Sequence, residues 1–339
     1  MPCALWITPS VQAPEPPAQP VASVGDFDSS LRSSEQFAVI VSYQPDWDHL
    51  VRLLQALHGQ GVRVVIVDNA SNFSPLRVEA LISAPSQSRV TWIQNLSNLG
   101  LGAAQNIGIR VALTQGADHV TLLDQDSLPG PGMFQTLRAA LAQLRAAGHR
   151  VFAVGPRLVD EGSGDVVPFI AYEHGRKRRH RCLDSDAPLE CFSLMASGTT
   201  FDAIALETVG LLDEGLFIEY VDVEWGARAR DKGWVCFGVP AATMQHNLGD
   251  ERMNVAGLLS LPLHSPLRHY YTFRNAMLMQ RRTYVPVFWK RADLLRCAMT
   301  APLFVVFAGR PFSQLKMILL GVLHGLKGIQ GPYRGRPQA

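Results

Sequence analysis

The sequence predicts an α/β fold in which a mainly parallel sheet is flanked by helices. Short apolar runs with the composition of buried strands alternate along the chain with segments whose apolar residues recur at helical spacing. That alternation is typical of a parallel sheet with helices on both faces. Polar residues also follow four of the strands directly, and ligands bind at the carboxyl ends of such strands. One edge of the sheet is therefore predicted to carry a binding site.

Each predicted element follows from its own pattern. In the first helix the apolar residues Trp47, Leu50, Leu54 and Leu57 recur every three or four positions. Strands of the first half are predicted at 37–43, 62–67, 90–93 and 120–123, and helices at 46–58 and 102–114. Strands of the second half are predicted at 152–156, 192–201 and 234–239, with a short helix at 222–231. From about Pro266 the chain is predicted to be helical.

The composition indicates a chain that can bury a sizeable core. Of its 339 residues 47% are hydrophobic, and 31 basic residues nearly balance 29 acidic ones. A net charge of +2 gives no strong attraction to nucleic acid, so we expect no nucleic-acid partner. Five scattered cysteines favour reduced thiols in the cytoplasm. The N-terminus lacks the pattern of a secretory signal, and no apolar stretch reaches the roughly 18 residues of a spanning helix.

Two carboxylates end one of the predicted strands. Asp124 and Asp126 follow the apolar run at 120–123, and side chains two residues apart on an extended chain point the same way. A buried strand would not end in two charges unless they had a partner. Hard cations favour carboxylate and phosphate oxygens, so Mg²⁺ or Mn²⁺ carrying a diphosphate is the predicted partner. The alternative is a polar strand end that caps the next helix.

Short segments of the chain, taken in order, resemble the inverting family 2 nucleotide-sugar glycosyltransferases of the GT-A fold. They lie at 41–43, 67–71, 98–100, 124–126, 217–225, 246–250 and 274–275. The resemblance extends from about Phe37 to Arg282. Leu-Asp-Gln-Asp-Ser at 123–127 and Tyr-Val-Asp-Val-Glu-Trp at 220–225 are most similar to the bacterial rhamnosyltransferase branch. The resemblance implies a Rossmann-like GT-A sheet with a C-terminal helical extension.

The resemblance also implies a set of metal ligands. The last Asp of the motif is the family's usual direct ligand, which assigns that role to Asp126. Asp124 would act directly or through ribose and water. His246 is implied as a third metal ligand or a diphosphate contact, because neutral imidazole binds Mn²⁺ and a protonated ring favours phosphate. A histidine satisfied within a loop is the alternative for His246.

The nucleotide contacts are implied in the same way. Asp68 would accept the N–H of a pyrimidine ring, because a carboxylate is a strong acceptor for that donor. Ser42 and Tyr43 would line the same pocket, and Asn98 and Asn106 are further candidates for nucleotide or sugar contacts. The alternative for Asp68 is an Asx-turn after its strand. Such a pocket takes either UDP or dTDP.

The acceptor hydroxyl must lose its proton as it attacks, and a carboxylate within hydrogen-bond reach is the simplest general base. Asp222 aligns with the family's catalytic carboxylate. Glu219 and Glu224 are nearby rivals, because this sequence departs from many relatives at both positions. The alternative for Asp222 is that acidic residues favour the N-terminus of a helix. The two roles are compatible, since a helix start also holds a carboxylate rigidly.

Several other segments leave alternatives open. The basic run at 176–181 is either a solvated loop or a contact for an anionic membrane or the diphosphate of a lipid-linked acceptor. The stretch at 285–331 mixes apolar residues with cations, which fits an interfacial helix, a helical domain packed on the core, or a dimer interface. Trp225 and Trp234 either stack on a sugar or belong to the core. The stretch at 197–199 is a candidate for backbone approach to the sugar.

The leading hypothesis is a metal-dependent inverting glycosyltransferase. It would move L-rhamnose from dTDP-L-rhamnose to a saccharide or lipid-linked saccharide in cell-surface polysaccharide synthesis, and a UDP-sugar is the alternative donor. Gly100 and Gly102 after a strand suggest a dinucleotide-dependent oxidoreductase, but Gln105 replaces the third glycine of that fingerprint. A sugar- or lipid-binding scaffold without catalysis is the non-enzymatic alternative.

The predicted domain organisation has three parts. Residues 1–35 are rich in proline and serine and are predicted to be a disordered tail. Residues 36–265 form the GT-A domain, with a nucleotide-binding half at 36–130 and an acceptor half at 131–265. Residues 266–339 form a helical region that contacts the membrane or packs on the core. The protein is expected in the cytoplasm, bound peripherally to the inner face of the cell membrane. Whether it forms a homo-oligomer is left open by the sequence.

Overall fold

The computed structural model describes most of the chain. The described residues are 35–72, 90–173, 176–246, 252–255, 259–262 and 264–335. The chain divides into one unit at 1–33 and a second at 34–339, and every described residue belongs to the second. The predicted tail at 1–35 therefore lies outside the described residues, except for Glu35. The segment at 247–250, which contributed to the family resemblance, lies outside them as well.

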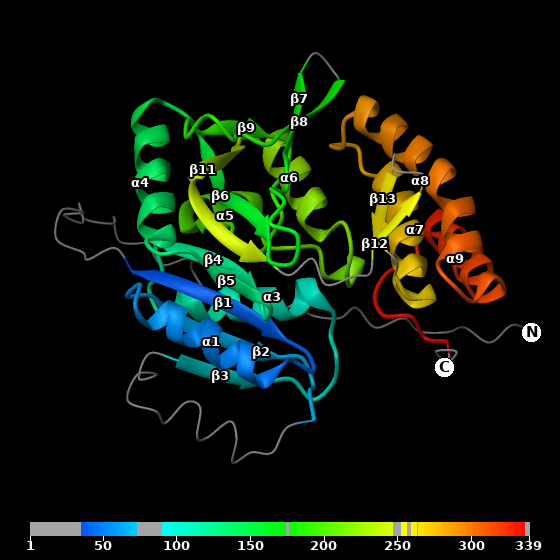
Figure 1. Ribbon diagram of the computed structural model, residues 1–339, viewed down its shortest axis with the longest axis horizontal. Coiled ribbons are helices and arrows are strands. Elements are labelled where there is room, and N and C mark those ends of the chain that lie inside the picture. Colours follow the sequence, from blue (N-terminus) through cyan, green and yellow to red (C-terminus); the bar gives the residue numbers. More distant parts are fainter. Residues whose placement is uncertain are drawn as a thin grey trace, which may run out of the picture. The chain divides into compact units, whose positions relative to one another are not determined.

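The first half of the central sheet is parallel and follows the predicted strands closely. Its order is β3 (Val90–Gln94), β2 (Arg63–Asp68), β1 (Gln36–Ser42) and β4 (His119–Asp124). The β1 register pairs Ser42 with Asp68 on β2 and Val41 with Asp124 on β4. The carboxyl ends of these strands therefore lie at one edge of the sheet, as the sequence predicted (Figure 1).

The second half of the sheet mixes directions. The order continues from β4 through β10 (Thr200–Asp202), β6 (Val151–Asp160), β11 (Val235–His246) and β5 (Ser127–Pro129), and β9 (Leu189–Cys191) also pairs with β11. β10 runs antiparallel to both neighbours, whereas β6 and β11 are parallel to each other. The sheet is therefore mixed, with the parallel strands forming its main part.

The predicted strand at 192–201 was too long, because only its last two residues enter β10. The segment turns at Gly198, whose φ is +80°. A Cβ at this position would lie 2.7 Å from Pro156 and 2.9 Å from Met244, so neither the conformation nor the space suits a larger residue. β11 shows the opposite difference, since it continues beyond the predicted 234–239 as far as His246.

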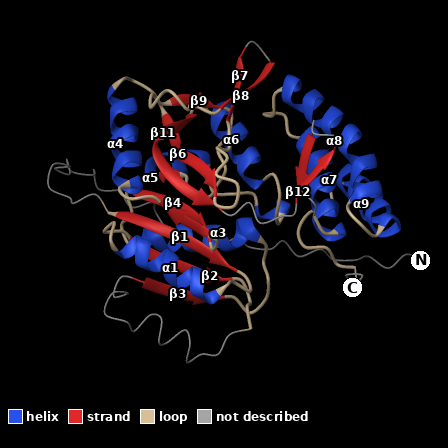
Figure 2. Cartoon of the chain, viewed as in Figure 1, coloured by secondary structure: helices blue, strands red, loops and turns tan. Residues whose placement is uncertain are grey.

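Helices cover both faces of the sheet (Figure 2). Alternate residues of β1 enter two separate cores: Phe37 and Val39 enter one, and Ala38 and Ile40 enter the other. The first core also receives α3 (Leu101–Thr114), α5 (Ala203–Val209) and α6 (Val221–Asp231). The second receives α1 (Trp47–His58) and α4 (Met133–Ala146). This arrangement confirms the α/β prediction.

The C-terminal region is helical, as predicted. Its helices are α7 (Pro266–Gln280), α8 (Val287–Phe307) and α9 (Pro311–Lys327), which pack together in Figure 1. Gly321 permits close approach of α9 to α7, because a Cβ there would lie 2.5 Å from the Tyr270 carbonyl oxygen. Among the described residues, no helix is long and apolar enough to cross a membrane.

Two small hairpins lie outside the central sheet. One joins β12 (Arg252–Val255) to β13 (Leu259–Pro262). The other joins β7 (Phe169–Glu173) to β8 (Arg176–His180), so most of the basic run at 176–181 is a strand rather than a loop. Successive side chains of a strand point to opposite sides, and Lys177 of β8 points to a cavity that Tyr172 of β7 also lines.

Candidate active site

The predicted metal ligands converge at the carboxyl end of β4. Asp124 is the last residue of β4, Asp126 lies in the turn that follows, and His246 is the last residue of β11. The antiparallel register of β11 with β5 pairs His246 with Ser127 and so brings these ends together. His246 Nε2 lies 4.0 Å from Asp124 Oδ2, and His246 Nδ1 lies 3.9 Å from Asp126 Oδ1. One ligand atom from each of the three residues lies within 4.8 Å of the others.

Two buried serines hold these ligands in place. Ser127 Oγ lies 3.0 Å from His246 Nδ1 and 2.8 Å from Ser197 Oγ. The backbone N–H of Asp124 donates to Ser197 Oγ at 3.0 Å. The sequence suggested the stretch at 197–199 only for an approach to the sugar. Its contact with the ligands depends on the turn at Gly198, which no local pattern indicated.

The donor set fits a hard divalent cation. Burial raises the pKa of the Asp124 carboxyl, and the charge of Asp126 also raises it, whereas His246 opposes the shift. The two carboxylates repel each other in the bare protein, and a cation between them would relieve that repulsion. Mg²⁺ favours carboxylate oxygens, and Mn²⁺ also accepts an imidazole nitrogen. Asp124, Asp126 and His246 can therefore hold either ion.

Asp68 lies buried at the neighbouring strand end. One of its carboxylate oxygens accepts the Ser42 hydroxyl at 2.9 Å, and the other accepts the backbone N–H of Ser71 at 2.8 Å. The second contact reaches three residues along the chain, one further than the Asx-turn that was the alternative, and the first joins Asp68 to the end of β1. The structure thus places Asp68 and Ser42 together, with the carboxylate fixed from two sides.

Gln125 ties the end of β1 to the turn after β4, a role that the sequence did not predict. Its side-chain oxygen accepts the Tyr43 N–H at 2.8 Å, and its amide nitrogen donates to the Tyr43 carbonyl at 3.3 Å. The Tyr43 side chain is half exposed. The middle residue of the Asp124–Asp126 motif therefore sets the distance between the ends of β1 and β4. Its amide, which can donate and accept at once, was the available signal.

Asn106 and Gly100 serve the packing of α3, and the exposed Asn98 lies just before that helix. Asn106 is buried, donates to the Leu212 carbonyl at 2.9 Å and accepts the Leu212 N–H at 3.0 Å. The Asn98 side-chain oxygen accepts the Gly100 N–H at 2.9 Å. Gly100 has φ +88°, and a Cβ there would lie 2.6 Å from Phe217. The positive φ and the close contact with Phe217 explain why residue 100 is a glycine, and no dinucleotide is needed to explain it.

Asp222 lies in the first turn of α6 and lines a cavity of about 450 Å³. Glu219, Trp289 and Arg296 line the same cavity, so residues from α6, α8 and the preceding loop surround it. Burial raises the pKa of the Asp222 carboxyl to about 6, and the charges of Glu219 and Asp124 also raise it. The backbone N–H of Val223 opposes the shift by donating to Asp222 Oδ1 at 2.8 Å.

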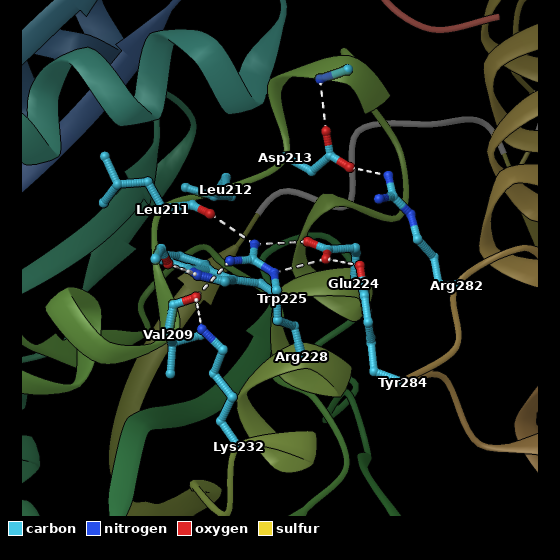
Figure 3. Close-up of polar contacts among 12 residues, drawn as sticks. Val209, Leu211, Leu212, Asp213, Glu224, Trp225, Arg228, Lys232, Arg282 and Tyr284 are labelled. Atoms are coloured by element: carbon cyan, nitrogen blue, oxygen red, sulfur yellow. Dashed lines mark hydrogen bonds and ion pairs between the residues drawn. The ribbon is translucent and has the colours of Figure 1, made fainter. Parts of the chain in front are cut away.

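The rival Glu224 is committed to the protein interior (Figure 3). It is 1% exposed, and Arg228 donates to both of its oxygens at 2.8 and 2.9 Å. The Tyr284 hydroxyl also donates to it. Arg228 in turn donates to the carbonyls of Val209 and Leu211, so Glu224 anchors α6 to the loop after α5. This network leaves Glu224 outside the cavity that Asp222 lines.

The remaining candidates divide in the same way. Glu219 lines the cavity, but Arg268 Nε donates to it at 2.6 Å. Trp225 is buried in the core and donates to the Gly210 carbonyl at 2.7 Å, as Figure 3 shows in part. Trp234 is also a core residue, with the Arg150 guanidinium over its ring. Both tryptophans therefore take the core alternative.

Comparison with known proteins identifies the family. The profile of the family described as Glycosyl transferase family 2 matches residues 37–196. The chain is 31% identical over 300 residues to the dTDP-rhamnosyl transferase RfbF of Shigella flexneri, which covers 88% of this chain and 98% of that protein. The chain belongs to glycosyltransferase family 2. This glycosyltransferase is also 28% identical over 254 residues to the galactofuranosyltransferase GlfT1 of Mycobacterium tuberculosis, over 70% of its own length and 80% of that protein.

Solved structures confirm the predicted GT-A fold. The glycosyltransferase superposes on GalNAc-T7, solved with UDP, GalNAc and Mn²⁺, with a TM-score of 0.55 and 15% identity. That match covers 89% of this chain and 57% of GalNAc-T7, so the chain spans a little over half of that protein. It superposes on residues 1–349 of S. aureus TarS, solved with UDP-GlcNAc, with a TM-score of 0.51 and 12% identity over 87% and 81% of the two chains.

The segment before Asp222 has an unusual backbone in this glycosyltransferase. Phe217, Glu219 and Tyr220 have φ values of +65°, +64° and +66°, in a region that side chains disfavour. Such strain persists only where the surroundings hold it, and it concentrates at functional sites. The segment therefore needs partners that fix it.

The C-terminal helices supply those partners. The buried amide of Asn275 on α7 donates to the carbonyls of Leu216 at 3.0 Å, Ile218 at 2.7 Å and Glu219 at 2.8 Å. The buried Arg274 donates to the Leu216 carbonyl at 2.7 Å. On α8, Asp293 accepts the Tyr220 hydroxyl at 2.9 Å, and Arg296 donates to the same hydroxyl. The sequence singled out Arg274 and Asn275 only through the family resemblance.

Proposed function

We propose that this glycosyltransferase is metal-dependent and inverting, and that it transfers L-rhamnose from dTDP-L-rhamnose to a saccharide or lipid-linked saccharide acceptor. The product would be part of a cell-surface polysaccharide. One observation carries the proposal: the chain combines a candidate metal site, formed by Asp124, Asp126 and His246, with a cavity of about 450 Å³ that the Asp222 carboxylate lines. The first would hold the donor diphosphate, and the second would admit the attacking acceptor.

The choice of donor rests on two supports. RfbF of Shigella flexneri, the relative with 31% identity, is a dTDP-rhamnosyl transferase. Asp68 holds a fixed, buried carboxylate at the end of β2, and a carboxylate is a strong acceptor for the N–H of a pyrimidine ring. Ser42 and Tyr43 would complete the base pocket. UDP shares that ring N–H, so a UDP-sugar is the second candidate donor.

Asp222 would act as the general base. The acceptor hydroxyl oxygen attacks the anomeric carbon from the face opposite the diphosphate, and its proton passes to an Asp222 carboxylate oxygen. The new C–O bond forms as the bond to the diphosphate breaks, so dTDP leaves and the configuration inverts. A pKa of about 6 leaves the carboxylate ionised at neutral pH while keeping it a stronger base than an ordinary aspartate.

Asp124, Asp126 and His246 would hold Mg²⁺ or Mn²⁺. When bound, the ion would offset the negative charge that develops on the departing diphosphate. The serines 127 and 197 would keep the ligands oriented, because their hydrogen bonds fix the His246 ring and the end of β4. A solved relative of the fold, GalNAc-T7, contains Mn²⁺, which supports a divalent ion here.

The reaction would take place in the cytoplasm, at the inner face of the cell membrane. The described cysteines 182, 191, 236 and 297 are free thiols, which supports a reducing compartment. A lipid-linked acceptor would be presented at that surface.

The test measures nucleotide release by the purified full-length protein. We would supply dTDP-L-rhamnose, UDP-glucose or UDP-galactose with Mn²⁺ or Mg²⁺, and add membrane glycolipid fractions as acceptors. We expect dTDP release from dTDP-L-rhamnose that depends on acceptor and stops with EDTA. Full transfer in EDTA would refute the metal role. A preference for a UDP-sugar would show that the donor is that sugar and not dTDP-L-rhamnose. Tight binding of dTDP with no turnover on any acceptor would favour the scaffold alternative.

A further inference from the structure

Helix α9 has two apolar faces, and only one is covered. Its inner face, which includes Met317, Ile318 and Gly321, packs against α7 and the rest of the C-terminal region. Its outer face carries large apolar residues that recur every three or four positions and so form one stripe. The stripe consists of Phe312, Leu315, Leu319, Leu323 and Leu326. Phe312 is 88% exposed, and Leu319 and Leu326 are each 60% exposed.

Helix α8 repeats this organisation. Trp289, Cys297 and Phe304 are buried on its inner face. Leu295 and Met299, on the opposite side by helical spacing, are 62% and 56% exposed. α8 and α9 pack on each other and form one layer of neighbouring helices, and both carry exposed apolar residues. Large apolar residues that recur along one side of a helix and remain exposed mark a site of association.

The charge on this layer has a single sign. Asp293 is the only acidic residue between Thr283 and Ala339, and it is buried beside Arg296, which donates to it at 2.9 Å. By helical spacing, Lys316 and Lys327 flank the α9 stripe on the same side. No ion pair joins either lysine to another residue of the described chain. The exposed surface of α8 and α9 is therefore apolar and cationic together.

We propose that this face of α8 and α9 docks on the surface of a bilayer that contains anionic lipid. An apolar stripe with basic residues beside it enters the boundary between acyl chains and headgroups, and its cations contact anionic headgroups. No described helix can span the bilayer, so the contact is peripheral. A second copy of the chain fits less well, because an isologous contact would bring the same uncompensated cations of both copies together.

Docking would connect the bilayer with the candidate active site through one helix. The outer side of α8 would meet lipid, while Asp293 and Arg296 on the same helix bond the Tyr220 hydroxyl two residues before Asp222. The docking surface lies apart from the metal ligands and the base. The proposal therefore stands whether or not the proposed donor is correct.

The experiment measures partitioning of the full-length protein onto vesicles by flotation. We expect binding to vesicles of phosphatidylglycerol and phosphatidylethanolamine and at least tenfold weaker binding to phosphatidylcholine vesicles. Raising the salt to 1 M should weaken binding to the anionic vesicles, because it screens the lysines. Equal binding to both compositions would refute the role of charge, and failure to bind the anionic vesicles would overturn the proposal.

Matched variants locate the surface. Leu319→Glu should lower partitioning at least tenfold, whereas Ile204→Glu, which alters an apolar residue of similar exposure (63%) on α5, should not. The double change Lys316→Glu and Lys327→Glu should lower binding to anionic vesicles only. Circular dichroism would verify that each variant is folded, and reduced hydrogen exchange of α9 on vesicles gives a measurement on the unaltered chain. Unchanged partitioning of Leu319→Glu, or a dimer in light scattering that this change dissociates, would overturn the proposal.

Discussion

The two sides of the candidate active site are built differently. On the side proposed for the donor, Asp68, Asp124 and His246 are each the last residue of a strand. On the side proposed for the acceptor, Asp222 follows a loop with three positive φ angles. The sheet itself places the first group, because neighbouring strands share a register. Side chains of α7 and α8 place Asp222.

This difference predicts separable failures. Changes at the strand ends should remove nucleotide binding and leave the loop before Asp222 intact. Asn275, Asp293 and Arg296 bond the segment before Asp222, and we call these three residues the clamp. Changes in the clamp should leave nucleotide binding intact and displace the general base Asp222. The acceptor side also depends on residues from the C-terminal region, which lie beyond the 37–196 range of the family profile.

The largest effect is expected at the metal cluster. Asp126→Ala removes one of three ligands and leaves Asp124 and His246, so transfer should fall about 10⁴-fold, a loss of several kcal/mol in transition-state stabilisation. Calorimetric titration should show that Mn²⁺ no longer strengthens dTDP binding. Asp165→Ala, at an exposed aspartate in the loop after β6, is the control and should behave as the parent. Metal-dependent binding that survives in Asp126→Ala would mean that the donor side is not built on this residue.

Asp222→Asn should separate the two sides most cleanly. The amide keeps the shape and removes the base, so turnover should fall about 10³-fold, within the range of general-base catalysis. Binding of dTDP with Mn²⁺ should stay within a factor of two or so, because none of the donor-side residues changes. Titration and single-turnover transfer on the same preparation would check both parts. Unchanged turnover would move the base to another residue, and Glu219 would be the first to examine.

Asn275→Ala tests the clamp at a distance. The carbonyl groups of Ile218 and Glu219 would lose this donor, whereas the Leu216 carbonyl would keep Arg274. A displacement of Asp222 by about 1 Å costs up to 10²-fold in rate. We expect kcat to fall about 10- to 100-fold with the KM for donor unchanged, measured well below the lowered melting temperature. Gln280→Ala, which removes one weaker bond at the end of α7, is the control. An equal rise in donor KM would show that the two sides are not separate.

The same contrast decides what could be predicted from sequence. The strands at 37–43, 62–67, 90–93 and 120–123 were predicted nearly in full, because each is a short apolar run with polar residues directly after it. Asp124 and Asp126 could be paired because they are two residues apart on an extended chain. Their partner His246 came from the family resemblance, and no local period connects residues 127 and 246.

The acceptor side could not be predicted because its geometry depends on contacts between remote residues. Asn275 and Glu219 are 56 positions apart, and their bond joins a side chain to a backbone carbonyl, which leaves no pattern in either segment. Glu224 could not be separated from Asp222 as a base either. The deciding contacts come from Arg228, one turn further along α6, and from Tyr284 beyond α7. The strand predicted at 192–201 was too long for a related reason, since the residues that crowd the turn at Gly198, Pro156 and Met244, are remote from it in sequence.

The pH dependence of transfer should report the acceptor side. The Asp222 carboxyl has a pKa of about 6 and must be ionised to accept a proton, so kcat/KM should fall below that pH. The expected loss is about tenfold at pH 5 relative to the plateau, with a slope near one per pH unit. Asp222→Asn should lose this limb of the profile, whereas Asn275→Ala should shift it. A profile that is flat from pH 5 to 8 would exclude Asp222 as the base.

The smallest effect concerns stability and has the opposite sign to the loss of activity. The folded-state pKa of Asp222 is raised from 3.8 to about 6, so its protonated form stabilises the fold below about pH 4 and this contribution is lost as the pH rises through 6. Asp222→Asn keeps an uncharged side chain at every pH. It should therefore be more stable than the parent at pH 7, by about 1 kcal/mol after allowance for partial exposure, or ~2–4 °C in melting temperature. At pH 4 the difference should vanish. Thermal unfolding at the two pH values measures both, and a variant that is less stable at pH 7 would show that burial does not raise the free energy of the ionised carboxylate.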